Sequence, residues 1–204
     1  MGLISNGTTV FDAGAMSAGF GGAMTFIKKL TASSSATLSF VNGASSVVLD
    51  NTYKSYLFVY NNIHPATNSA SLTFQGSIDT GSNYNVAITS TLFQGYHKED
   101  GSGGGVAYNT ANDQAQGTSF QVICQGIGND NDECGCGSLH LFNPSSTTFV
   151  KNFIGRGSNS FHQDFAEDEN SAGYFNNTSA IDAIQFKMSS GNIDAGTITL
   201  YGIA

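Results

Sequence analysis

The sequence predicts an all-β protein, an antiparallel two-sheet sandwich of jelly-roll type preceded by an irregular N-terminal arm. Its 204 residues include 25 Gly, 25 Ser, 19 Asn and 18 Thr, which lower helix propensity and favour turns, caps or strands. Hydrophobic residues make up 40% of the chain and aromatic residues 11%, enough apolar surface to form a core. Many short runs alternate apolar and polar residues, the period of a half-buried strand.

The first segment differs in composition from the rest of the chain. Residues 1–24 are rich in Gly, Ala and Ser and contain only isolated apolar side chains. Such a segment is typical of an arm that orders against another surface. The length of the remainder suits one domain, so we expect a docking arm at 1–24 and a single β-sandwich domain at 25–204.

Ten runs with strand periodicity follow the arm. In the longest, Tyr56, Phe58 and Tyr60 fall on one face and Leu57 and Val59 on the other, which indicates a strand buried on both sides or one lying between the core and a partner subunit. Glycine-rich residues 95–117 are expected to form an exposed loop. Without a fixed-period repeat or intervening helices, the strands are expected to pack as a sandwich. The ten runs are residues 25–31, 36–41, 53–63, 71–78, 84–93, 120–124, 139–141, 149–153, 184–188 and 198–200.

The charge balance excludes two classes of partner. Seven basic and fifteen acidic residues give a formal charge of −8, whereas binding to nucleic acid or an anionic membrane requires a surplus of Lys and Arg. The chain also lacks an apolar stretch of about 20 residues that could span a bilayer. Residues 1–20 do not have the pattern of a secretory signal, so we expect synthesis in a cytoplasm.

An acidic loop at residues 126–133 is the candidate cation site. Asp130, Asp132 and Glu133 concentrate the carboxylate oxygens that Ca²⁺ prefers. The calcium-loop template starting at Asp130 fails, because Cys134 and Leu141 occupy positions where that template places oxygen ligands. A solvated hairpin tip is therefore the favoured interpretation, and no metal is predicted.

The three cysteines, Cys124, Cys134 and Cys136, lie close together in the sequence. Their odd number argues against a secreted disulfide framework, so free thiols are expected, with a bridge from Cys124 to one of the others as the alternative. Together with His140 they offer four soft ligands for zinc. Structural zinc sites usually combine two separated pairs of ligands, and this pattern has a single CxC pair, so unpaired thiols are favoured.

The sequence predicts no enzyme and no cofactor. His64, His97, His140 and His162 stand in different segments, and no nucleophile elbow, HExxH pattern or phosphate loop is present. A second acidic cluster comprises Asp164, Glu167, Asp168 and Glu169. A carboxylate pair for glycosidic chemistry requires a defined separation in space, so we favour a charged loop facing water.

Three segments carry a family resemblance: NNIHPAT at residues 61–67, LFNPSSTTFVK at 141–151 and SSGNIDAGTITLYGI at 189–203. They are similar to segments of small virion proteins of tailed phages of aquatic bacteria, cyanophages among them, and the similarity extends over nearly the whole chain. The resemblance implies a structural role in a virus particle and supplies no catalytic residues.

These observations lead to two expectations about function. The first is a non-enzymatic virion protein made in the host cytoplasm, which decorates the capsid as a cement protein or belongs to the tail or a fibre. Its partners would be other virion proteins and copies of itself, with a trimer favoured by analogy. The alternative is a receptor- or carbohydrate-binding head of a tail fibre, which would stack host surface glycans on exposed aromatic rings. The candidates for stacking are Tyr96, Tyr108, Phe161 and Tyr174.

Overall fold

The structure is a computed structural model that describes residues 3–12, 15–16 and 23–204, and in this part of the chain every regular element is a β-strand. All strand pairs are antiparallel, so the all-β antiparallel prediction is confirmed. The strands are β1 (Leu3–Ser5), β2 (Thr8–Asp12), β3 (Ala15–Met16), β4 (Met24–Thr31), β5 (Leu38–Val41), β6 (Ser55–Pro65), β7 (Ala70–Ser77), β8 (Ile88–Lys98), β9 (Gly104–Tyr108), β10 (Ala115–Gly117), β11 (Gln121–Ile127), β12 (Gly135–Phe142), β13 (Lys151–Phe161), β14 (Phe165–Phe175), β15 (Ala183–Met188) and β16 (Ile193–Ile203).

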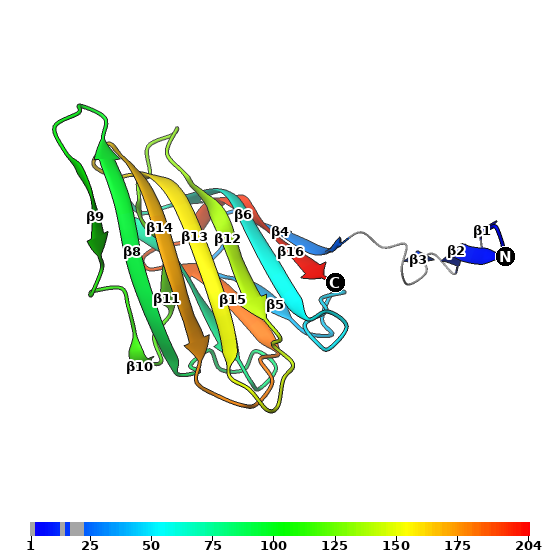
Figure 1. Ribbon diagram of the computed structural model, residues 1–204. Helices are drawn as coiled ribbons and strands as arrows, with labels where there is room; N and C mark the ends of the chain where they lie inside the picture. Colours follow the sequence, from blue (N-terminus) through cyan, green and yellow to red (C-terminus); the bar gives the residue numbers. More distant parts are fainter. Residues whose placement is uncertain (1–2, 13–14, 17–22) are drawn as a thin grey trace.

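Thirteen of these strands form one large sheet that folds back over itself (Figure 1). Its main path has the order β4-β16-β6-β12-β13-β11-β7-β15-β5, and β14, β8, β9 and β10 extend it beyond β13. The connection in the middle of this path is narrow, because β11 meets β13 only at the pair Ile127 and Phe161. The two stretches of sheet on either side of this connection enclose the core, which gives a sandwich-like or barrel-like body.

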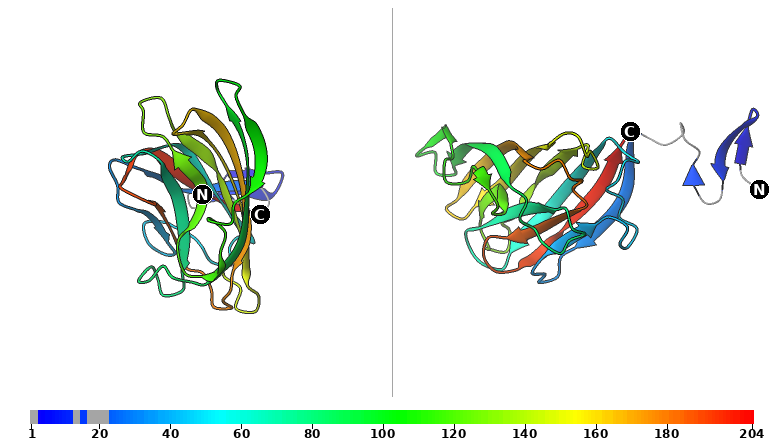
Figure 2. Two further views of the ribbon diagram at one scale, coloured as in Figure 1. Left: turned by 90° about the vertical axis from the view of Figure 1, so that its left-hand side faces the viewer. Right: turned by 90° about the horizontal axis from the view of Figure 1, so that it is seen from below.

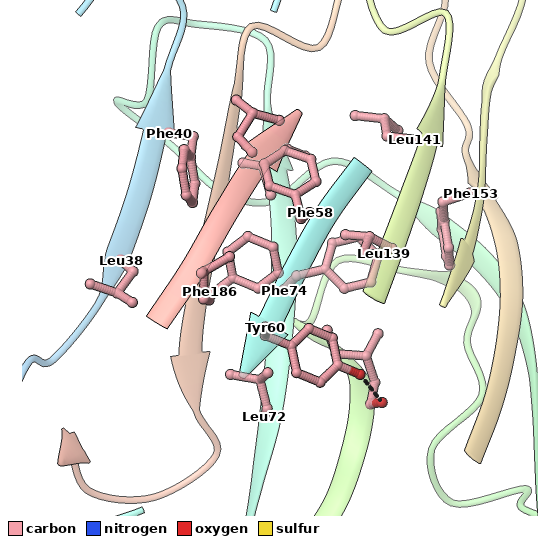
Figure 3. Close-up of a cluster of buried hydrophobic side chains, with 14 of the residues drawn as sticks. Leu38, Phe40, Phe58, Tyr60, Leu72, Phe74, Leu139, Leu141, Phe153 and Phe186 are labelled. Atoms are coloured by element: carbon pink, nitrogen blue, oxygen red, sulfur yellow. Dashed lines mark hydrogen bonds between the residues drawn. The ribbon is translucent and has the colours of Figure 1, made fainter. Parts of the chain in front are cut away.

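The core is a cluster of aromatic and aliphatic side chains from both stretches (Figure 3). Phe58 of β6 and Phe74 of β7 are fully buried, and aromatic rings meet edge to face across the layers, as Phe74 and Phe153 do at 5.0 Å. Tyr60 is also buried, and its hydroxyl donates hydrogen bonds to the carbonyl oxygens of Ile123, at 3.1 Å, and Arg156, at 3.0 Å. Its hydroxyl therefore links the two strands that carry those carbonyls.

Each of the ten predicted strands overlaps an observed one, and the two faces predicted for β6 differ in burial. Tyr56, Phe58 and Tyr60 are fully buried, whereas Leu57 and Val59 on the other face are half-buried.

The turn before β2 consists of Asn6 and Gly7, both with positive φ, as a two-residue hairpin turn of type I′ requires.

Two segments predicted to be loops are strands. In residues 95–117, β8 continues to Lys98, and β9 and β10 pair with it. The acidic cluster of Asp164, Glu167, Asp168 and Glu169 is also predicted to be a charged loop facing water, and that prediction is wrong for the last three, which lie in β14 between β13 and β8. The cluster looked like a loop because it has charged side chains on both faces of a strand.

The N-terminal arm is only partly described. Residues 3–12 and 15–16 form a separate sheet with the order β1-β2-β3, so this part is not irregular as expected. Figures 1 and 2 show that sheet apart from the large one. The rest of the predicted arm, residues 1–2, 13–14 and 17–22, lies outside the described residues, and the domain boundary at 24 stays a prediction. No helix in the described ranges is long and apolar enough to cross a membrane.

Candidate functional site

The candidate cation loop forms a hydrogen-bonded turn. The backbone N–H of Asp130 donates to Glu133 Oε2 at 2.8 Å, and the N–H of Glu133 donates to the Asp130 carbonyl at 2.9 Å. Asp130, Asp132 and Glu133 border a cavity of about 240 Å³ together with Glu99 and Asp164. Within the described ranges, no three His, Cys, Asp or Glu side chains converge as metal ligands do. The structure thus brings the three predicted residues to one cavity without a coordinating arrangement.

The zinc candidates are divided between two faces of the sheet. Cys124 is fully buried, and its thiol donates to Asn159 Oδ1 at 3.4 Å. Cys134 and Cys136 are partly exposed, and all three thiols are free. A Cβ placed on Gly135 would lie 2.8 Å from Cys124 Sγ, so Cys124 lies behind the backbone that carries the other two. This placement does not support a bridge from Cys124 to either of them.

His64 lies in a polar environment next to Cys134. Its Nδ1 is 3.7 Å from Asp194 Oδ2, and its Nε2 is 3.3 Å from the Asp130 carbonyl. His64 and Cys134 border one cavity of about 450 Å³. The pKa of the Cys134 thiol is raised, first by burial and then by the neighbouring Cys136, which is the opposite of an activated nucleophile. The thiol that borders the His64 cavity is therefore not activated as a catalytic nucleophile.

The most unusual polar group is a pair of buried glutamates from the acidic cluster that was expected to face water. Glu167 and Glu169 alternate along β14 and face inward, with exposed fractions of 3% and 0%. Burial raises the pKa of Glu167 to about 7. Burial, and then the charge of Glu167, raise the pKa of Glu169 to about 8. These are buried carboxyl groups that favour the protonated form near neutral pH.

Amide side chains and backbone groups surround this pair. The Gln125 N–H donates to Glu169 Oε2 at 2.7 Å, and Asn159 Nδ2 donates to the Gln125 carbonyl at 2.9 Å. Within the described residues, Glu167 Oε2 and Glu169 Oε1 have no hydrogen-bond partner. Neither glutamate borders any of the cavities described here. The pair is thus enclosed between β14 and β11.

The outer face of the large sheet carries a row of mostly apolar side chains across neighbouring strands. The strand registers place Phe26, Tyr201, Leu57, His140, Ile154 and Ala172 next to one another, from β4 to β14. We call these six residues the apolar row. Phe26 and Ile154 are 60% and 55% exposed, and burial lowers the pKa of His140, which favours the neutral ring. The row therefore presents apolar surface to solvent without a formal charge.

One end of the apolar row borders a cavity of about 430 Å³. Ile154 and Ala172 belong to its lining, which also contains the aromatic rings of Phe142 and Tyr174. Polar groups reach it from Asn152 of β13 and from the β8 residues Thr89, Ser90 and Thr91. The size lies within the range of small-ligand sites, which are mostly apolar with a few polar groups.

Of the four aromatic residues considered for glycan stacking, only Tyr174 borders this cavity. Tyr108 is 53% exposed, and its hydroxyl donates to Asp113 Oδ2 at 2.6 Å. Tyr96 and Phe161 each stack on Phe165, with ring centroids 5.8 Å and 5.3 Å away. The structure therefore does not gather the four into one surface.

No known protein family, curated protein or solved structure matches this chain.

Proposed function

We propose that this chain is a non-enzymatic structural protein of a phage particle, either a capsid decoration protein or a module associated with the tail or a fibre. The observation that carries the proposal is the apolar row on the outer face of the sheet. Exposed apolar patches mark interaction surfaces, and a protein present in many copies gains stability from repeated subunit contacts. The segments that resemble small phage virion proteins support the same role.

The strand order supports a jelly-roll form for the domain. One stretch of the sheet has the order β4-β16-β6-β12, and the other has β5-β15-β7-β11. Consecutive strands β4 and β5, β6 and β7, and β11 and β12 therefore fall in different stretches, as they do when a chain winds between two sheets. Jelly-roll domains of this kind occur in viral capsids and lectins. The hairpin β13–β14 and strands β8, β9 and β10 would be additions to this pattern.

The apolar row favours self-association through the outer face. Row members on six adjacent strands, with Phe26 and Tyr201 in edge-to-face contact at 6.1 Å, provide a broad surface. The outer face also carries a salt bridge between Arg156 and Asp168, with Nε to Oδ1 at 2.9 Å, where both charges are neutralised locally. A symmetric oligomer would cover the exposed rings and leave the acidic loops in solvent.

The proposal is tested by separating purified particles from free protein on a density gradient. We expect the chain to migrate with the particles at a constant number of copies per particle. A chain found only in the soluble fraction of infected cells, and absent from washed particles, would refute the proposal.

The second candidate function is glycan binding at the cavity beside Tyr174. Sugar rings stack on aromatic side chains, and their hydroxyls pair with amide and hydroxyl groups such as those of Asn152 and Thr91. A glycan array with the full chain tests this function. Tyr174→Ala should then abolish binding and Tyr108→Ala should retain it. If no glycan binds, or if the two variants bind equally, the cavity is not a glycan site.

A further inference from the structure

Two of the three cysteines are neighbours at the solvent-facing start of β12. Cys134 and Cys136 stand two positions apart on an extended segment, so their side chains project to the same side. Their Sγ atoms lie 3.9 Å and 3.7 Å from the same atom, Asn62 Oδ1. Both residues are partly exposed. A reagent in solution can therefore reach a pair of adjacent thiols.

The backbone around this pair is irregular, which allows the two sulfur atoms to approach each other. Asn62 has a φ of 51° and lies opposite Cys136 where β6 and β12 slip register between Gly135 and Gly137. Its backbone N–H donates to Cys136 Sγ at 3.3 Å. Residues two apart on a strand have Cα atoms about 6.6 Å apart, at the upper end of the range that a disulfide spans. A disulfide also requires the two Cβ atoms to lie within about 4.5 Å of each other, so closure requires the segment to bend near Gly135, where the register slips.

The third cysteine is separated from this pair. Cys124 is fully buried on the inner face of the sheet, behind Gly135. Its thiol is enclosed by protein atoms, whereas Cys134 and Cys136 are partly exposed, so access to reagents distinguishes Cys124 from the other two. The chain therefore contains its own control, a cysteine that is close in sequence but shielded from reagents.

We propose that Cys134 and Cys136 form a reversible dithiol–disulfide pair that is oxidised by small-molecule disulfides. One cysteine loses its proton, and its thiolate attacks a sulfur of the reagent RSSR. The reagent's S–S bond breaks, and the released RS⁻ takes up a proton. The thiolate of the other cysteine then attacks the protein sulfur of the mixed disulfide and releases a second RSH. In total the protein loses two electrons and two protons, and the reagent becomes two RSH.

The experiment treats the folded full chain with glutathione disulfide. Remaining thiols are then alkylated with N-ethylmaleimide after denaturation. Cleavage after Glu133 separates Cys124 from the other two cysteines for mass spectrometry. We expect the peptide that contains Cys134 and Cys136 to be two hydrogen atoms lighter than its reduced form and not alkylated. Cys124 should be alkylated, and two reduced glutathione molecules should be released per chain.

Single substitutions distinguish the pair from two independent thiols. Cys134→Ser and Cys136→Ser should each retain glutathione on the remaining cysteine, because no neighbour is left to displace it. The proposal is overturned if the wild-type chain also accumulates stable glutathione adducts, if both cysteines are recovered alkylated, or if oxidation yields only disulfide-linked dimers. Circular dichroism of the variants checks that they keep the β-sheet fold.

Discussion

Glu167 and Glu169 place two carboxyl groups inside the sheet, where charge is costly. An unfolded glutamate has a pKa of about 4.3, whereas burial raises the pKa of Glu169 to about 8 and that of Glu167 to about 7. The folded chain therefore binds protons that the unfolded chain releases. The resulting stability is fully present below the unfolded pKa, and it is lost as the pH rises through the folded values of 7 to 8.

Replacing Glu169 by Gln should remove the part of this loss that Glu169 causes, whereas Glu167 stays buried and ionisable. The amide oxygen of Gln can still accept the hydrogen bond from the Gln125 N–H, and it cannot ionise. We expect the free energy of unfolding of the wild-type chain to fall on the order of 2 kcal/mol between pH 5 and pH 9, and that of Glu169→Gln to fall less. Urea denaturation at both pH values measures this, with the exposed Glu99→Gln as control. A wild-type profile that is flat over this range would contradict the account.

At the level of elements, β11 crosses very close to β13, and Gly157 makes this approach possible. A Cβ at Gly157 would lie 2.5 Å from the Ile123 carbonyl oxygen and 3.0 Å from the Tyr60 hydroxyl. Because the nearest atom belongs to the backbone of β11, the strand itself would have to move. The hydrogen bonds from Tyr60 to the Ile123 and Arg156 carbonyls depend on the same spacing.

Gly157→Ala should therefore destabilise the fold by about 2 kcal/mol through overpacking. Gly95→Ala is the matched control on β8, since its Cβ would meet nothing closer than 3.9 Å. The control should be neutral or slightly stabilising, because Ala restricts the unfolded chain. Urea denaturation of both variants measures the difference. Equal stabilities would show that the close crossing of β11 and β13 is not required.

The strands that could be predicted from sequence are those with one apolar and one polar face, such as β7, or with apolar residues on both faces, such as β6. Strand β14 could not be predicted from sequence, because its inward residues include Glu167 and Glu169. Their carboxyl groups lose their charge only when burial in the folded protein favours the protonated form. Asp130, Asp132 and Glu133 were correctly placed near one another by their sequence proximity. The apolar row could not be found that way, because its members come from six strands and meet only through long-range register.

At the level of the whole molecule, the apolar row should control self-association. Ile154→Lys would place a charge on an exposed member of the row, near its β14 end, and should shift the chain toward a monomer, at least tenfold in dissociation constant. Ser158→Lys, which also projects outward from β13, is the control and should leave association unchanged. Sedimentation velocity measures both. If wild type and Ile154→Lys show the same assembly state, the row is not the contact surface.

The N-terminal segment makes a separate prediction about attachment. Its small sheet shares no strand pairing with the large sheet within the described residues, so it is suited to contact another protein. We expect a chain that lacks residues 1–24 to keep the fold of the large sheet, with the circular dichroism spectrum of a β-sheet protein, and to lose most of its binding to particles. Co-sedimentation with particles that lack the protein measures this. Normal incorporation of the shortened chain would refute the docking role.

If the chain is a repeated structural component of a phage particle, it should be visible in an averaged electron cryomicroscopy image of particles that carry it. We expect sandwich-shaped density at symmetry-related positions on the capsid, tail or fibre, with the apolar row covered by a neighbouring copy or another virion protein. Intact particles that lack such density would show that the chain is not a structural component of the particle.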